Sequence, residues 1–188
     1  MRALQIRSAK YAVQIVDDPT YTPGSADNLR AYSREYLLTD RHTLSSRHGV
    51  IAGEADGEKQ AIIILAGGGG STVHIHSALI VGDRLFIAVG NLISCLMLPS
   101  LELDWQCVVD TATCFGVYYS PENDCLISHG ECEVARISMS GLVEWSASGK
   151  DIFTEGFQLF SDRIEVIDFN HEQYRVGITN GHISLVGG

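Results

Sequence analysis

The chain has 188 residues, 45% of them hydrophobic, and a formal net charge of −10. This length suits one globular domain with a sizeable core, and the hydrophobic content is too high for a disordered chain. The acidic balance and the lack of a basic cluster argue against nucleic-acid binding. No apolar run of about 18 residues and no signal-peptide pattern is present, so no membrane association is expected.

The cysteines indicate the cellular compartment in which the protein is expected. There are five, Cys95, Cys107, Cys114, Cys125 and Cys132, an odd number without a close pair. Four of the five lie inside apolar, strand-like runs. This pattern favours reduced thiols in the core of a cytoplasmic protein over a disulfide framework.

Residues 1–33 differ from the rest of the chain. Side chains alternate between apolar and polar over residues 11–16, which predicts one strand. Residues 17–28 contain two prolines, a glycine and several small polar residues, and this composition predicts a loop. We therefore expect an N-terminal extension over 1–33 that serves as an edge or closing strand for a repeat domain over 34–188.

Short β-rich runs follow from about residue 36 onward. The clearest group lies between residues 83 and 123, where turn residues separate the runs 84–89, 92–98, 101–109 and 114–119. Two of these runs are apolar on both faces, so neighbouring sheets should cover both sides of them. No sustained helical periodicity is present, and little helix is expected.

The runs recur with a period of 40 residues. A step of 40 takes Trp105 to Trp145 and Gly141 to Gly181. Four strands in about 40 residues are typical of a β-propeller blade, which must stack on its neighbours to bury both faces. The sequence thus predicts an all-β, propeller-like array of about four four-stranded units, as a closed ring or an open arc. A homodimer in which two arcs complete one ring also fits this count.

One segment of this repeat resembles a known family. Residues 135–145 (ARISMSGLVEW) place a Ser-Gly turn before a strand that ends in tryptophan, as in the repeats of quinoprotein-type (PQQ-like) propellers. Weaker copies occupy 95–105 and 175–185, the last with Leu185 in place of tryptophan. The resemblance covers about residues 60–188 and implies a propeller-like fold. It does not carry over the quinone cofactor, because no matching set of cofactor or calcium ligands is found.

A histidine pair is the clearest candidate for chemistry. His74 and His76 would lie on the same face of a strand and could ligate a zinc-like ion. A third ligand would have to come from His129, His48 or Asp168. The alternative is that His76 packs in the place that glycine occupies in later units. The glycine run at 67–70 lacks the lysine of a phosphate-binding P-loop and is expected to be a flexible connection between units.

Two loops are candidates for binding a partner. Asp110 and Thr111 occupy the same position between units as Lys150 and Asp151. Loops of this kind gather on one face of a propeller and often bind other proteins. The alternative is that the aspartates order turns through side-chain hydrogen bonds.

These observations lead to three hypotheses about function. The first is a non-catalytic module that binds another protein, such as an inhibitor or immunity-type protein that masks a basic partner; the acidic charge and the repeat scaffold favour it. The second is a metal-dependent hydrolase or lyase centred on His74 and His76. The third is small-molecule binding in a propeller channel. No assembled catalytic set is recognisable, so no enzyme activity and no cofactor is favoured.

Overall fold

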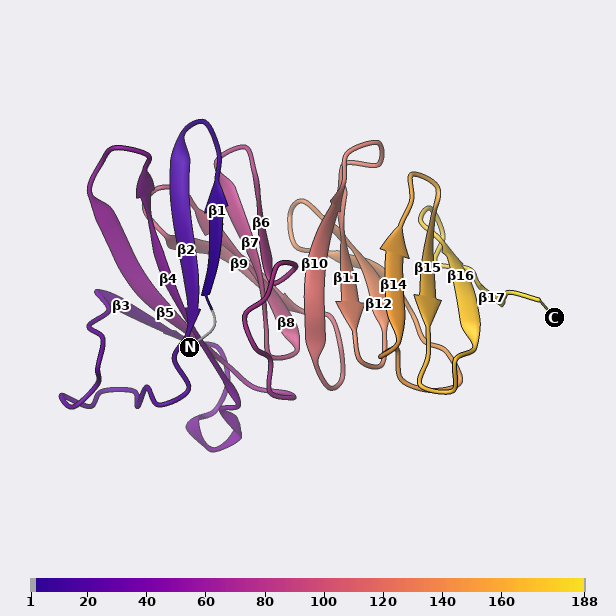
Figure 1. Cartoon of the computed structure of the whole chain (residues 1–188), viewed down its shortest axis with the longest axis horizontal. Coiled ribbons are helices and arrows are strands. Elements are labelled where there is room, and N and C mark those ends of the chain that lie inside the picture. The colour runs from indigo at the N-terminus through magenta and orange to yellow at the C-terminus, as the bar shows by residue number, and fades with distance from the viewer. Residues whose placement is uncertain (1–2, 188) are drawn as a thin grey trace.

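A computed structural model describes residues 3–187 and consists of four β-sheets that stand side by side in chain order (Figure 1). The sheets at the two ends of the row lie far apart, so the molecule is an open arc of blades and the ring is not closed. Within the described residues, the helical structure consists of a single 3-10 turn at Arg41–Thr43. The predictions of an all-β fold, of four-stranded units and of an open arc as one of two forms are confirmed.

The last three sheets share one plan, in which consecutive strands pair antiparallel. Sheet B comprises β6 (Ala78–Val81), β7 (Arg84–Val89), β8 (Leu92–Met97) and β9 (Glu102–Val108). Sheet C comprises β10 (Cys114–Ser120), β11 (Cys125–Gly130), β12 (Val134–Ser138) and β13 (Val143–Ala147). Sheet D comprises β14 (Gly156–Leu159), β15 (Arg163–Ile167), β16 (Gln173–Gly177) and β17 (Ile183–Leu185).

Sheet A departs from this plan. It has five strands in the order β1-β2-β4-β5-β3, and β3 pairs parallel to β5. Its members are β1 (Ala3–Arg7), β2 (Tyr11–Asp17), β3 (Arg34–Leu37), β4 (Ser46–Glu54) and β5 (Lys59–Ala66). The strand expected at 11–16 is present, but it lies inside the sheet between β1 and β4. Residues 3–17 are therefore part of the first sheet.

Alternate side chains of the central strands fill the spaces between sheets. On β7, Leu85 packs against sheet A, whereas the adjacent Phe86 packs against sheet C. On β11, Leu126 faces sheet B and Ile127 faces sheet D. This alternation is why the runs are apolar on both faces, and it gives three cores for four sheets.

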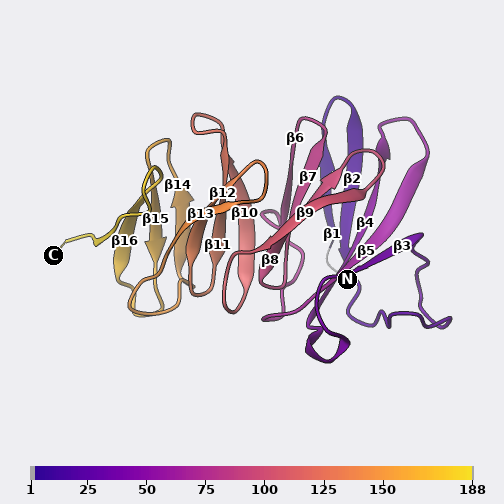
Figure 2. The same ribbon diagram turned by 180° about the vertical axis from the view of Figure 1, so that it is seen from behind.

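A recurring polar device also joins the sheets. Trp105 Nε1 of sheet B and Arg84 both donate to the backbone carbonyl of Met139 in sheet C, at 3.2 and 2.7 Å. Trp145 Nε1 and Arg136 of sheet C donate in the same way to the carbonyl of Ile178, beside sheet D. The strands β9 and β13 that carry the tryptophans come to the front in Figure 2.

The two outward faces of the arc are covered differently. On sheet A, Tyr21, Tyr32 and Leu44 from the loops that flank β3 pack over Ile63 and Leu65. On sheet D the outward positions include three charged side chains, and Glu165 accepts from Arg163 at 2.9 Å and from Arg175 at 3.2 Å. None of the described residues forms a helix long and apolar enough to cross a membrane.

Candidate functional site: a groove of aromatic and histidine side chains

The loops between sheets and the turn between β11 and β12 form a continuous rim, because each one hydrogen-bonds to the next. The Gly69 N–H donates to the Ala112 carbonyl at 2.7 Å, and the Glu131 N–H donates to the Thr113 carbonyl at 2.7 Å. The Phe153 N–H then donates to the Glu131 carbonyl, also at 2.7 Å. This rim, made of residues 67–77, 109–113, 130–133 and 148–155, connects sheets A to D at one end of their strands.

A groove opens beside the rim, between the loop that precedes sheet B and the first strands of sheets C and D. Sheet C approaches sheet B closely here, since β10 contacts both β6 and β7. The groove has a volume of about 450 Å³. Its lining comes from strands of sheets C and D and from the loops that precede sheets B and D: His74, His76, Phe115, Tyr118, His129, Thr154 and Phe157.

The aromatic rings of this lining form a closed circuit. The His76 ring stacks on Tyr118 with centroids 4.8 Å apart, and Tyr118 stacks on Phe157 at 4.3 Å. Phe157 stacks on His129 at 4.7 Å, and His129 meets the edge of Phe115 at 5.4 Å. His74 closes the circuit, because it meets His76 edge-on and its Nε2 contacts the Phe115 carbonyl at 2.6 Å. Each contact fixes its neighbours, so the lining is preorganised.

Backbone groups occupy the ring nitrogens of the histidines. His74 Nε2 donates to the Phe115 carbonyl, and its Nδ1 accepts from the His76 N–H at 3.2 Å. His129 Nε2 donates to the Phe153 carbonyl at 3.1 Å. These bonds fix a neutral tautomer for His74, because one ring nitrogen donates while the other accepts.

Desolvation also favours the neutral forms of His129 and His76. Desolvation lowers the pKa of His129 to about 4, with a smaller contribution in the same direction from His74 and His76. Desolvation lowers the pKa of His76 as well. At neutral pH the groove therefore presents uncharged, largely apolar rings.

The predicted zinc-like site gains no support from this geometry. The structure brings His74, His76 and His129 into one groove, but a ligating nitrogen needs a free lone pair, and both nitrogens of His74 are already engaged. Residues 3–187 contain no group of three His, Cys, Asp or Glu side chains placed to hold a metal ion.

The predicted partner-binding residues lie on the rim but differ in exposure. Asp110 is only 2% exposed, and its carboxylate accepts backbone N–H bonds from Ala112, Cys132 and Glu133. Thr111 is exposed, as is Lys150, which pairs with Glu172 at 3.1 Å. Asp151 is half-buried and accepts from Asn170. Asp110 thus orders the rim, which is the alternative role that its residue type suggests.

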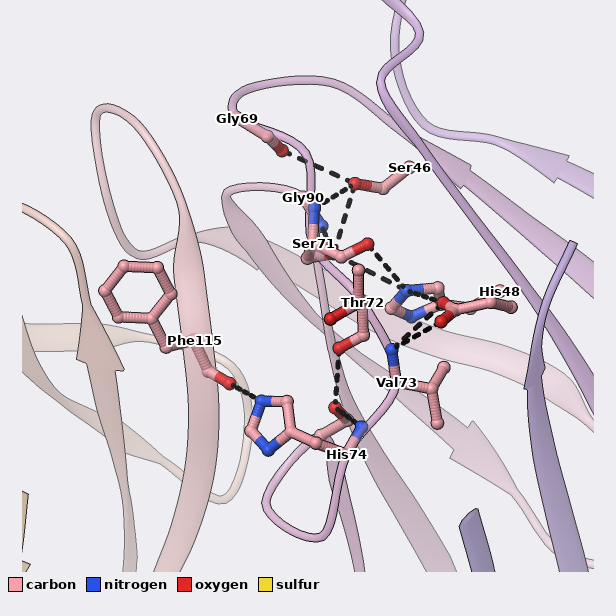
Figure 3. A network of polar contacts seen from close by, with 11 residues as sticks. Ser46, His48, Gly69, Ser71, Thr72, Val73, His74, Gly90 and Phe115 are labelled. Atoms are coloured by element: carbon pink, nitrogen blue, oxygen red, sulfur yellow. Dashed lines mark hydrogen bonds and ion pairs between the residues drawn. The ribbon is translucent and has the colours of Figure 1, made fainter. Parts of the chain in front are cut away.

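A second polar cluster lies where sheet A meets the rim (Figure 3). His48 is fully buried, with its Nε2 3.4 Å from an Asp17 oxygen and 3.5 Å from Ser71 Oγ. In a nucleophile–base–acid triad, the serine and the carboxylate contact different nitrogens of the imidazole. Here both contact Nε2, and Ser71 Oγ also donates to Ser46 at 3.1 Å and accepts from the Gly90 N–H. The cluster therefore fastens the rim to sheet A and is not a catalytic triad.

Three residues of the groove were not expected from the sequence: Phe115, Tyr118 and Phe157. Aromatic residues in β-rich runs are normally interpreted as core. The signal that could have identified them is the 40-residue step, which places the small residues Gly116 and Gly156 in register with His76. Gly116 lies directly against the backbone and Cβ of His76, so the small residue lets this strand approach the histidine loop.

Comparisons with known proteins address the fold. No protein-family model and no curated protein matches the chain. Among solved structures, HIRA(644-1017) aligns over 99% of this chain with a TM-score of 0.51 and 9% identity. The WD40 β-propeller domain of Doa1 aligns over 82% with a TM-score of 0.51 and 9% identity. A computationally designed protein, Ika8, aligns over 95% with a TM-score of 0.52 and 11% identity.

The molecule is an open arc of a β-propeller. The chain spans 53%, 54% and 59% of the lengths of these three structures, that is, somewhat over half of each. At 9–11% identity the likeness concerns the fold alone. The quinoprotein type of repeat stays a prediction, because the propeller type named among these structures is WD40, that of the Doa1 domain.

Proposed function

We propose that this arc is a non-catalytic protein-binding module that holds a partner polypeptide on the rim and in the groove. The observation that carries the proposal is the groove itself. Aromatic rings from sheets C and D and from the loop before sheet B line an open hollow of about 450 Å³ on a molecule whose other large apolar side chains mostly pack between sheets. Preformed hollows with rigid aromatic walls are where interface anchors bind.

The surroundings of the groove support binding over catalysis. The Nε2–H groups of His74 and His129 donate to backbone carbonyls, so these two protons are engaged in structural hydrogen bonds. The cysteine thiol of Cys114 is buried, and burial raises its pKa, which makes it a poor nucleophile. A version of this function in which binding masks a basic partner is consistent with the net charge of −10.

Site-specific photo-crosslinking tests the proposal. A photoreactive amino acid replaces Thr154, which is exposed in the groove, and in a matched variant it replaces Ser184, which is exposed on β17. In the native host we expect Thr154 to crosslink one partner that then binds the purified chain at a one-to-one ratio. Crosslinking only from Ser184, or equally from both positions, would contradict the proposal.

A further inference from the structure

The rim beside the groove is acidic. Its residues carry five carboxylates and, within the described chain, one ammonium group, that of Lys150. Asp110 is buried, Lys150 is paired with Glu172, and the remaining carboxylates are those of Glu131, Glu133, Asp151 and Glu155. The rim therefore carries an excess of negative charge that is available to a partner.

The backbone of Glu131 is held firmly beside the groove. Its backbone joins the two loops on either side, through the Thr113 carbonyl and the Phe153 N–H. Those loops lead directly into Phe115 and Thr154, which line the groove. Glu155 follows Thr154 and is exposed at the start of β14. Two carboxylates thus lie within two residues of side chains that line the hollow.

The rings give the hollow a largely apolar lining. In the loop that carries His74 and His76, Ile75 is 71% exposed, which is unusual for an isoleucine. It adds exposed apolar surface to that loop. A partner side chain in the groove would exchange water for aromatic carbon on several sides, whereas a charged group would find no counter-charge inside.

We propose, on the basis of the protein-binding function above, that the groove seats an apolar or aromatic side chain from a basic segment of the partner, whose flanking lysines or arginines pair with Glu131 and Glu155. The apolar anchor supplies most of the affinity, since buried anchors dominate interfaces. The carboxylates supply orientation, faster association and salt dependence, because exposed ion pairs contribute little affinity.

Matched synthetic peptides test this inference. One fluorescent set has a central Leu, Phe or Trp flanked by positions restricted to Lys, Arg, Gly and Ser, and the second set has Glu and Asp in place of Lys and Arg. Fluorescence anisotropy with the purified full chain should show saturable binding for members of the basic set only. Replacing the central anchor by Ser should weaken binding at least about tenfold.

Two pairs of protein variants locate the binding. Phe157→Ala should weaken binding of the best basic peptide at least about tenfold. The control is Phe160→Ala, at a half-buried aromatic residue just beyond the end of β14, and it should leave binding unchanged. Glu131→Gln should weaken binding about threefold and flatten its salt dependence, whereas Glu122→Gln, in an exposed turn, should do neither. Thermal unfolding of each variant identifies any that fails to fold, and His76→Ala then replaces Phe157→Ala.

The outcomes separate this inference from the function on which it rests. Tighter binding of the acidic set, basic-peptide binding that survives both Phe157→Ala (or its replacement) and Glu131→Gln, or no binding of any peptide would overturn the inference. The proposed function would still stand if the Thr154 crosslink identified a partner that docks through a different segment. If the Thr154 crosslink also failed, both would fall.

Discussion

The joint between sheets A and B and the joints between sheets B, C and D make the same kind of side-chain connection with different residues. In each case an aromatic side chain and an arginine of one sheet donate to a single carbonyl of the next. At the later joints the aromatic residue is Trp105 or Trp145, from the last strand of its sheet. At the first joint it is Tyr36 of the parallel strand β3, which donates to the Leu101 carbonyl at 3.0 Å while Arg34 approaches the same oxygen.

The turn contacted by the aromatic residue also differs between the two kinds of joint, with glycine at the later joints and leucine at the first. Gly141 and Gly181 have φ values of +86° and +66°, and a Cβ there would lie 2.6 Å and 2.7 Å from the indole of Trp105 and Trp145. Leu101 has a φ of 55° at the equivalent turn, yet it is fully buried in the core between sheets A and B. No indole covers this turn, so a side chain fits there despite the unfavourable backbone. All three joints thus share the contact with a carbonyl. Glycine is needed in the turn only where an indole of tryptophan packs on it.

Removing an indole should have the largest effect. Trp105→Ala or Trp145→Ala deletes a ring that packs on a glycine and leaves a carbonyl with one donor fewer, at an expected cost of about 3 kcal/mol in the free energy of unfolding. Chemical denaturation measures this cost. A loss below about 1 kcal/mol for both variants would mean that the tryptophans are not structural joints.

Acid should affect the joint between sheets C and D next most strongly. His129 has a pKa of about 4 when folded and 6.5 when unfolded, so only the unfolded chain takes up a proton as the pH falls from 7. Its contribution to stability is complete above about pH 6.5 and is lost as the pH falls towards 4, by about 2 kcal/mol between pH 7 and 5. His129→Gln should lose correspondingly less over this range in denaturation at several pH values. Equal pH dependence in both proteins would contradict the assignment.

The joint between sheets A and B should show the smallest effect. Tyr36→Phe keeps the ring but removes a hydroxyl that donates to the Leu101 carbonyl and accepts from the Leu103 N–H at 3.1 Å. We expect a loss of about 1 kcal/mol, because Arg34 still reaches the carbonyl. If Tyr36→Phe proved as damaging as Trp145→Ala, the two kinds of joint would not differ in strength.

The repeat could be predicted for sheets B to D because each strand pairs with the next one in sequence. The step from Trp105 to Trp145 and from Gly141 to Gly181 reflects one repeated contact, indole on glycine. Sheet A was less predictable. Its strand β3 is four residues long, follows a loop of 16 residues after β2, and pairs in parallel with β5. Non-local pairing of this kind leaves no periodic signal in the sequence.

The candidate site could be predicted only in part. The histidines at 74, 76 and 129 were singled out, and the structure places all three in the groove. What the sequence could not indicate is that their nitrogens bind the carbonyls of Phe115 and Phe153, since backbone partners have no sequence signature. Nor could it distinguish Tyr118 and Phe157 from core aromatics, because exposure along an inner edge depends on how the sheets are stacked.

The ion pairs on the outward face of sheet D have a consequence for how copies of this chain meet one another. Stacking of sheet D from one molecule on sheet A of the next would be a head-to-tail contact, and such contacts propagate into fibres when they do not close. That contact would strip water from the charged groups of Arg163, Glu165 and Arg175, and removing charged groups from water is costly. The pattern that lets one sheet bury itself against the next within the chain is thus interrupted where repetition would lead to polymerisation.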